Sequence, residues 1–197
     1  MAGPVGAGKS TLVNALAGRL EDTVAIHFDH YERMTEQPIE EVRRWMEEGA
    51  DLDRMPVPGL AEALHSLRQG RAVVHPATGA QIPAAKNILF ETQFGRRHAA
   101  TGAHVDFLVW IDLPLDIALA RKLRQFAAGV DPRNAGAAST FGPWLKEYLD
   151  NYVDVVGTLL RHQRETVAAD ADLVVDGALD PGEQANAVER ALDATRP

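Results

Sequence analysis

The chain has 197 residues, of which 46% are hydrophobic and 24% charged, as is typical of a globular protein. The net charge of -8 argues against a nucleic-acid binder, which needs a basic surface to displace counterions, and the lack of cysteine excludes disulfides and thiolate metal sites. We expect a single domain, residues 1–197, in the cytoplasm, since no apolar run reaches transmembrane length and no secretory signal precedes the first motif.

The opening residues 3–10 read Gly-Pro-Val-Gly-Ala-Gly-Lys-Ser and fit the phosphate-binding loop motif (P-loop) G-x-x-x-x-G-K-[ST] without a mismatch. Glycines let the backbone adopt positive φ and approach a phosphate, while successive N–H groups and the following helix attract its charge. Lys9 would bind the β/γ-phosphates of ATP, and the Ser10 hydroxyl would bind Mg²⁺. The predicted nucleotide-binding residues are Gly3, Pro4, Val5, Gly6, Ala7, Gly8, Lys9, Ser10 and Thr11.

A P-loop normally follows a buried central strand, but only Met1 and Ala2 precede the motif in this chain. We therefore expect the first central strand to be truncated or missing. Residues 11–17 continue as an apolar-striped helix, which is the structural context that the motif requires.

The next part of the chain alternates between short apolar runs and helical patterns. Residues 23–28 are rich in β-branched side chains and predict a strand. Residues 38–46 begin with proline and acids and predict a helix, and a second helix is predicted from Gly59 to Gln69. Residues 71–75 predict another short strand, and the segment that follows to Ala85 is read as a loop or a hairpin.

The remainder continues the alternation. Residues 87–91 and 107–112 predict strands, and their near-continuous apolar character suits parallel strands covered on both faces. Residues 115–126 predict a helix with a basic stripe, and the Gly/Ala-rich residues 127–140 predict a mobile loop. The last predicted elements are a long helix at 141–168, a strand at 173–177 and a helix at 181–194.

Strands that alternate with helices, with a P-loop at the first turn, imply a three-layer α/β/α fold around a mostly parallel sheet. Ligands in such folds bind at the carboxyl ends of the strands. This rule selects Asp29, Glu91 and Asp112 as candidate site acids.

Each of these acids has two readings. Asp29 is expected to face the P-loop, where a carboxylate accepts the proton of a substrate hydroxyl, although it could also cap the following turn. Glu91 would orient the Mg²⁺ shell or hold a substrate hydroxyl, or it is a solvated strand end. For Asp112, which Leu-Pro follows, we favour a helix N-cap.

Basic and histidine side chains supply further candidates. Arg121 and Arg124 share one face of a helix, and a lid formed by residues 121–140 could fold over the triphosphate. The alternative is a solvated basic face. His30 and His75 lie near predicted strand ends and are candidate substrate contacts.

In this order, the motifs resemble the P-loop kinases of the uridine kinase and phosphoribulokinase group. The resemblance covers most of the chain, and only the P-loop is highly specific. It rests on the P-loop, Phe28-Asp29-His30-Tyr31, Ile88-Leu89-Phe90-Glu91, residues 111–121 and residues 171–175.

The resemblance implies transfer of the γ-phosphoryl group of ATP, with Mg²⁺, to a hydroxyl of a small molecule. By position, Asp29 would be the general base, Glu91 would organise metal and substrate, and Arg121 and Arg124 would close on ATP. Tyr31 joins the candidate substrate contacts. Thr92 stands where the family usually has glycine, and the hairpin segment lacks a Tyr-Asp pair, so uridine itself is not indicated.

Two alternatives remain. A nucleoside monophosphate kinase would need arginines to bind the acceptor phosphate. The negative charge of Asp29 would repel that phosphate. Such arginines are available at Arg33, Arg43, Arg44 and Arg54. A non-catalytic nucleotide-binding or switch module is the alternative from another class. We expect a nucleoside-, sugar- or vitamin-precursor-like partner, neither nucleic acid nor membrane, and consider a homodimer compatible with the sequence.

Overall fold

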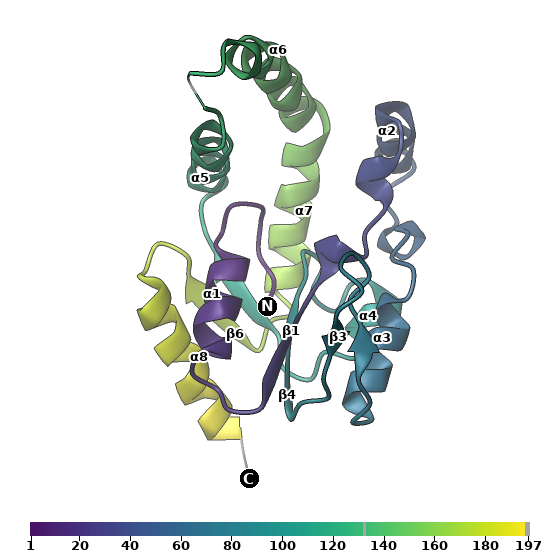
Figure 1. Cartoon of the computed structure of the whole chain (residues 1–197), viewed down its shortest axis with the longest axis vertical. Coiled ribbons are helices and arrows are strands. Elements are labelled where there is room, and N and C mark those ends of the chain that lie inside the picture. Colours follow the sequence, from purple (N-terminus) through teal and green to yellow (C-terminus); the bar gives the residue numbers. More distant parts are fainter. Residues whose placement is uncertain (132, 196–197) are drawn as a thin grey trace.

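The computed structural model describes residues 1–131 and 133–195. Strands and helices alternate along the chain (Figure 1). The strands are β1 (Thr23–His27), β2 (Val73–Val74), β3 (Gln81–Ile82), β4 (Asn87–Glu91), β5 (Val109–Asp112) and β6 (Leu173–Asp176). The helices are α1 (Lys9–Ala17), α2 (Ile39–Glu47), α3 (Leu60–Arg68), α4 (Ala99–Gly102), α5 (Leu115–Ala128), α6 (Ala135–Asn151), α7 (Gly157–Ala168) and α8 (Pro181–Thr195). Within the described residues, no helix has the length and apolarity needed to cross a membrane.

The central sheet consists of two parallel pairs of strands with the first residues of the chain between them. β1 pairs with β4, and β5 pairs with β6. The Met1 amine donates a hydrogen bond to the Phe90 carbonyl (2.6 Å), and Ala2 forms a parallel bridge with Trp110. Met1 and Ala2 therefore occupy the central position, where the sequence predicted a truncated or missing strand, and they connect β4 to β5.

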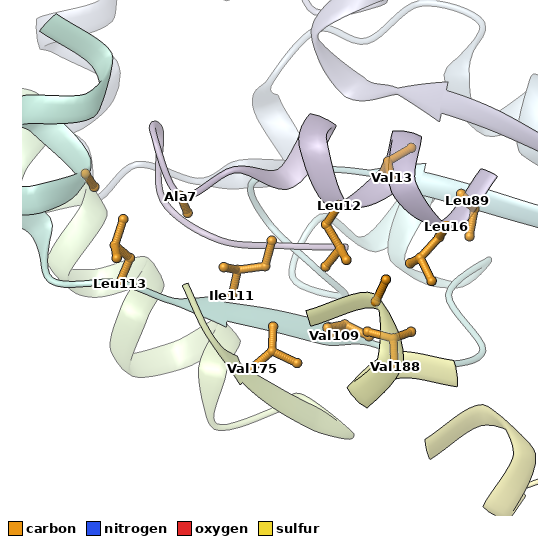
Figure 2. Close-up of a cluster of buried hydrophobic side chains, with 12 residues drawn as sticks. Ala7, Leu12, Val13, Leu16, Leu89, Val109, Ile111, Leu113, Val175 and Val188 are labelled. Atoms are coloured by element: carbon orange, nitrogen blue, oxygen red, sulfur yellow. The ribbon is translucent and has the colours of Figure 1, made fainter. Parts of the chain in front are cut away.

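Helices cover both faces of this sheet, because successive side chains of a strand point to opposite faces. On one face, Leu89 and Ile111 pack with α1 and α8 (Figure 2). On the other face, Phe90 packs with α3, and Trp110 packs with Val167 of α7. Burying one large apolar side chain stabilises the fold by about 1.5–3 kcal/mol. The packing on both faces of the sheet therefore holds the strands in place. The predicted three-layer α/β/α fold is confirmed.

The loop predicted at 127–140 is wrong at both ends, where the two flanking helices extend into the Gly/Ala-rich segment. α5 continues to Ala128, and α6 begins at Ala135. The Asn134 side chain accepts a hydrogen bond from the Ala137 N–H (3.1 Å). Alanine is the strongest helix former and asparagine is a good N-cap, which explains why the helices extend into this segment.

The long helix predicted at 141–168 is interrupted. A π-helical turn, η4 (Tyr152–Val156), separates α6 from α7. Such turns are frequent at functional sites. Arg43 of α2 donates a hydrogen bond to Asn151 at the end of α6 (3.2 Å). The helices α2 and α6 both extend beyond the sheet on one side and are joined at this contact (Figure 1).

Residues 71–85 adopt the hairpin alternative that the sequence left open. β2 and β3 pair in antiparallel fashion, with Val73 opposite Ile82. The Gly79 N–H donates a hydrogen bond to the His75 carbonyl (2.9 Å), which closes the turn. The hairpin therefore places His75 at the end of β2, beside the turn.

Candidate functional site

The P-loop lies between the central bridge and α1. Gly6 and Gly8 both have left-handed backbone conformations, with φ of 85° and 96°. A Cβ on Gly6 would lie 2.1 Å from the Ala118 carbonyl oxygen, whereas a Cβ on Gly8 would meet nothing within 4 Å. Gly6 thus allows the loop to pack against α5, and Gly8 leaves space at the start of α1. No described side chain caps this helix end, so its first N–H groups are available to an anion.

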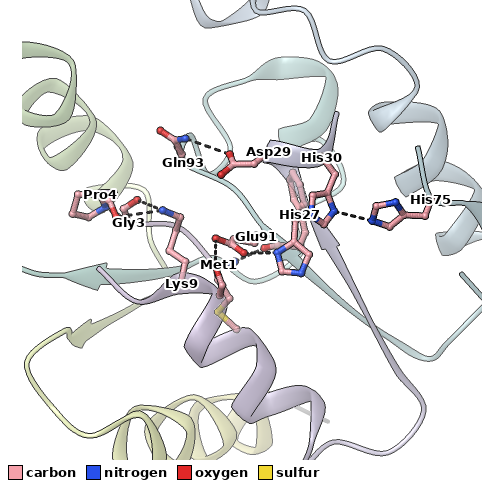
Figure 3. Close-up of polar contacts among 12 residues, drawn as sticks. Met1, Gly3, Pro4, Lys9, His27, Asp29, His30, His75, Glu91 and Gln93 are labelled. Carbon is pink, nitrogen blue, oxygen red and sulfur yellow. Dashed lines mark hydrogen bonds and ion pairs between the residues drawn. The ribbon is translucent and has the colours of Figure 1, made fainter. Parts of the chain in front are cut away.

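Lys9 is folded back onto the P-loop. Its Nζ donates hydrogen bonds to the carbonyls of Gly3 (3.1 Å) and Pro4 (3.3 Å). Removal from water lowers the pKa of Lys9, while the charges of Glu91 and Asp29 oppose this shift. The ammonium group is therefore held at the loop, near two carboxylates, in a position to attract phosphate oxygens (Figure 3).

Glu91 at the end of β4 links the P-loop to β1. Its Oε1 accepts a hydrogen bond from the Ser10 hydroxyl (3.0 Å), and its Oε2 is paired with His27 Nδ1. Burial works to raise the pKa of Glu91, but the His27 hydrogen bond, the Lys9 charge and the Ser10 hydrogen bond together hold it below its usual value. The hydrogen bond to Glu91 raises the pKa of His27. Each partner of the pair thus favours the charged form of the other.

The adjacent oxygens of Ser10 and Glu91 fit a magnesium ion that is also bound by phosphate. Mg²⁺ prefers oxygen ligands and usually takes one or two from the protein, with phosphates and water completing the shell. Among the described residues, no group of three or more His, Asp or Glu side chains could hold a metal ion unaided. This donor set therefore suits an ion that arrives with a nucleotide.

Asp29 follows β1 in a short 3-10 turn, η1 (Phe28–His30), and its side chain is exposed. Gln93 Nε2 donates a hydrogen bond to Asp29 Oδ1 (3.4 Å). His27 lies opposite Glu91 in the register of β1 and β4. Asp29 and Gln93 each follow two positions later, so they meet at the same edge of the sheet. The structure thus brings Lys9, Asp29 and Glu91 to one edge, as the strand-end rule predicts (Figure 3).

Sequence reasoning missed two residues of this edge, His27 and Gln93. His27 interrupts the apolar run of β1, and its register with Glu91 provides the partner. A polar side chain at the end of such a run was therefore a usable signal. Gln93 lies beyond its strand and carries no comparable signal.

His30 and His75 are brought together, although 45 residues separate them in the sequence. His75 Nε2 lies 2.9 Å from His30 Nδ1, with a ring-centroid distance of 4.6 Å. The ring of His30 also lies 5.0 Å from that of His27. The hairpin is thereby fixed to the end of β1. Tyr31, in contrast, is buried in the hydrophobic core with α2 and α3, and not at this edge.

The two lid arginines differ in their surroundings. Arg121 Nη1 donates a hydrogen bond to the Gly177 carbonyl at the end of β6 (2.8 Å), whereas Arg124 is exposed. Arg121 thus contacts the end of a neighbouring strand, and closure of either arginine on ATP stays a prediction.

The N-cap predicted for Asp112 is wrong. The N-cap position of α5 is Pro114, and no described side chain caps it. Asp112 instead accepts two hydrogen bonds from the guanidinium of Arg164, both at 2.8 Å, and one from the Trp110 indole (3.3 Å). Two charge-assisted hydrogen bonds outweigh the single backbone bond of a cap.

A cavity of about 540 Å³ is lined by residues of β4, α3 and α8 and by residues 104–108. Its lining includes Leu64, Phe90 and Leu108 and contains neither a P-loop residue nor Asp29. We therefore place the candidate site at the carboxyl ends of the strands.

Comparison with known proteins gives structural matches only. No family model matches the chain, and no curated protein matches its sequence. The solved structures that resemble it include several kinases. A possible uridine kinase from Bacillus stearothermophilus is 17% identical, with a TM-score of 0.49 and coverage of 89% of this chain and 85% of the other. Shikimate kinase from Acinetobacter baumannii is 17% identical, with a TM-score of 0.47 and coverage of 99% and 92%. Deoxyadenosine kinase from M. mycoides is 16% identical, with a TM-score of 0.45 and coverage of 98% and 96%.

Proposed function

We propose that the protein transfers the γ-phosphoryl group of ATP, with Mg²⁺, to a hydroxyl group of a small molecule. One observation carries this proposal. A P-loop with open space at Gly8 faces the same sheet edge as Lys9, the Ser10–Glu91 pair and the exposed carboxylate of Asp29. This edge offers positive charge and N–H groups for phosphates, oxygens for a metal, and a base for the acceptor.

The residues of the P-loop hold the nucleotide in this proposal. The N–H groups at the start of α1 bind phosphate oxygens, and Lys9 leaves the Gly3 and Pro4 carbonyls to bind the β/γ-phosphates. Ser10 and Glu91 hold Mg²⁺, which neutralises phosphate charge when bound. His27 keeps the Glu91 carboxylate oriented through its hydrogen bond.

Asp29 acts as the general base for the acceptor hydroxyl. The acceptor oxygen forms a bond to the γ-phosphorus while the bond from that phosphorus to the β–γ bridging oxygen breaks, so ADP leaves with the bridging oxygen. The hydroxyl proton passes to the Asp29 carboxylate. Gln93 orients this carboxylate, and closure of α5, the helix that carries Arg121 and Arg124, excludes water from the transfer.

The surroundings of the arginines support a hydroxyl acceptor over a nucleoside monophosphate. Each candidate for an acceptor-phosphate site is already paired with an acidic side chain. The pairs are Arg33 with Glu36 (3.5 Å), Arg43 with Asp154 (3.7 Å), Arg44 with Glu41 (3.1 Å) and Arg54 with Glu48. Binding an acceptor phosphate would have to break such pairs in the presence of Asp29.

The test is ADP release with Mg·ATP against a panel of nucleosides, sugars, hydroxy acids and vitamin precursors, with water alone as background. Asp29→Ala and Lys9→Ala are compared with Lys86→Ala, which changes an exposed lysine away from the P-loop. We expect one acceptor class to raise ADP release, Asp29→Ala to remove that increase, and Lys9→Ala to weaken ATP binding. A folded wild-type protein that binds no ATP would contradict the proposal. ATP binding through Lys9 without any active acceptor would favour the non-catalytic module.

A further inference from the structure

The histidine pair that joins the hairpin to β1 has a defined hydrogen-bond direction. The N–H groups of Ala77 and Thr78 both donate to His75 Nδ1, at 3.2 and 3.3 Å. His75 Nδ1 therefore carries a lone pair and no proton. A neutral imidazole has its one proton on the other nitrogen, so His75 Nε2–H is the donor to His30 Nδ1.

The same reasoning fixes the tautomer of His30. Its Nδ1 accepts the hydrogen bond from His75, so its own proton is on Nε2. Among the interactions of the described residues, none involves His30 Nε2. Figure 3 shows His30 between His75 and Asp29. The chain of hydrogen bonds that begins at the hairpin turn thus ends at His30, the residue that follows Asp29, and its Nε2–H has no hydrogen-bond partner among the described residues.

The surroundings of His30 favour the neutral form of its ring. Burial lowers the pKa of His30, and the neighbouring rings of His27 and His75 lower it further, while the negative charges of Asp29 and Glu91 oppose the shift. A second proton on His30 would also displace the hydrogen bond that His75 donates to it.

We propose that His30 and His75 determine acceptor specificity in the proposed phosphotransfer, with His30 Nε2–H donating to an uncharged oxygen next to the hydroxyl that Asp29 activates. This inference rests on the proposed function. A neutral donor suits a hydroxyl oxygen, whereas a carboxylate or phosphate at this position would face the negative charge of Asp29. The acceptor class is therefore a neutral polyhydroxy compound with adjacent hydroxyls.

His75 acts as a positioning residue in this arrangement. It contacts the acceptor only through His30, since its Nδ1 is taken by the turn and its Nε2 by His30. Its loss would free the His30 ring to rotate and to take the other tautomer. Replacement by glutamine keeps an N–H donor for His30, so His75→Gln should preserve much of what His75→Ala removes.

The experiment compares matched acceptors that differ in charge, such as glycerol with glycerate and a nucleoside with its monophosphate. ADP release is measured for wild type, His30→Ala, His75→Ala and His75→Gln. His65→Ala is the control, because His65 is an exposed histidine of α3 that contacts Gln69. We expect turnover with neutral members only. His30→Ala should raise the acceptor KM about tenfold, the equivalent of one neutral hydrogen bond, whereas His65→Ala should leave the acceptor KM unchanged.

The outcomes separate this inference from the proposed function. Turnover of anionic members only would leave phosphotransfer standing and overturn the assigned acceptor class. An unchanged acceptor KM in both alanine variants would overturn the role of the pair. If no acceptor of any class raises ADP release, the proposed function fails and the specificity assignment fails with it.

A second measurement does not depend on activity. Nitrogen-15 spectra of the imidazole rings report which nitrogen carries the proton. At neutral pH we expect both His30 and His75 to be protonated on Nε2 alone, and the neutral acceptor to shift His30 Nε2 more than His65. A proton on His75 Nδ1 would overturn the hydrogen-bond direction and the inference built on it.

Discussion

The nucleotide half and the acceptor half of the candidate site are constructed differently. The nucleotide half is a loop whose backbone conformation makes the site, with Gly6 packed against α5 and Gly8 next to open space. The acceptor half consists of side chains on exposed turns, where Asp29, His30 and His75 are held by hydrogen bonds across the chain. Phosphate recognition thus depends on backbone shape, and acceptor recognition depends on a few side-chain contacts.

This difference has a consequence for how the two halves respond to mutation. A backbone cradle is coupled to the packing of the fold, so changes in it affect stability and binding together. Exposed side chains are coupled to little else, so changes in them affect rate or specificity alone. Variants of the P-loop and variants of the exposed acceptor side chains test whether the two halves differ in this way.

The largest effect is expected for Asp29→Asn. The variant keeps the size of the side chain but removes the base, and general-base catalysis typically contributes about 10²–10⁴-fold in rate. We expect kcat to fall by about that factor, while ATP affinity and the free energy of unfolding stay unchanged because Asp29 is exposed. Steady-state kinetics and urea unfolding provide both measurements. A rate within threefold of wild type would remove Asp29 from the mechanism.

A smaller effect, on stability, is expected from alanine at the two P-loop glycines. Gly6→Ala places a Cβ against the Ala118 carbonyl oxygen at positive φ, which should cost about 2–5 kcal/mol of unfolding free energy. Gly8→Ala meets no atom and should cost only the conformational strain, about 1–2 kcal/mol.

Nucleotide binding distinguishes these two variants further. The Cβ of Gly8→Ala occupies the space left for a phosphate, so this variant should stay folded but lose ATP affinity. Urea unfolding and nucleotide titration of the same samples test the pair. Equal loss of stability in both variants would show that the Ala118 contact does not matter.

The sequence predicted the nucleotide half more completely than the acceptor half. A P-loop can be found from a short motif because each glycine answers a local backbone requirement. The strand ends at Asp29 and Glu91 were also predictable, since apolar runs mark strands and the fold rule places ligands at their carboxyl ends. The P-loop and the strand ends were predictable because each is determined by residues that are close together in the sequence.

The contacts that were missed join distant segments. His27 pairs with Glu91, which lies 64 residues later in the sequence. Asp112 is hydrogen-bonded to Arg164, 52 residues later, and does not form the predicted helix cap. The sequence alone does not show which distant residue pairs with His27 or with Asp112. The two ends of the loop predicted at 127–140 are helical for another reason, because alanine favours helix more strongly than the scattered glycines oppose it.

An effect below that of Gly6→Ala is expected for Lys9→Met. Loss of the charged hydrogen bonds to phosphate should weaken ATP binding by roughly 10–100-fold, or about 1.5–3 kcal/mol. The ligand-free protein should become more stable at neutral pH. The pKa of Lys9 is lowered by burial, so the folded state disfavours its charge; this penalty is complete below the folded pKa and shrinks as pH rises from that value toward the usual 10.5. Thermal unfolding with and without ATP measures both effects, with Lys86→Met as control. A loss of ligand-free stability would contradict this reading.

The smallest effect is expected for Asp112→Asn, an acid at a strand end that lies outside both halves. Its loss breaks the paired hydrogen bonds with Arg164 and should cost about 1 kcal/mol of unfolding free energy at neutral pH. The Arg164 hydrogen bonds hold the pKa of Asp112 below its usual 3.8. The stabilisation is therefore present above pH 3.8 and disappears as pH falls through the lower, folded-state pKa. Urea unfolding of both proteins between pH 7 and pH 3 should show the difference shrinking at the acid end, with kcat unchanged at neutral pH. A kcat loss comparable to that of Asp29→Asn would instead place Asp112 in the site and end the distinction between the two acids.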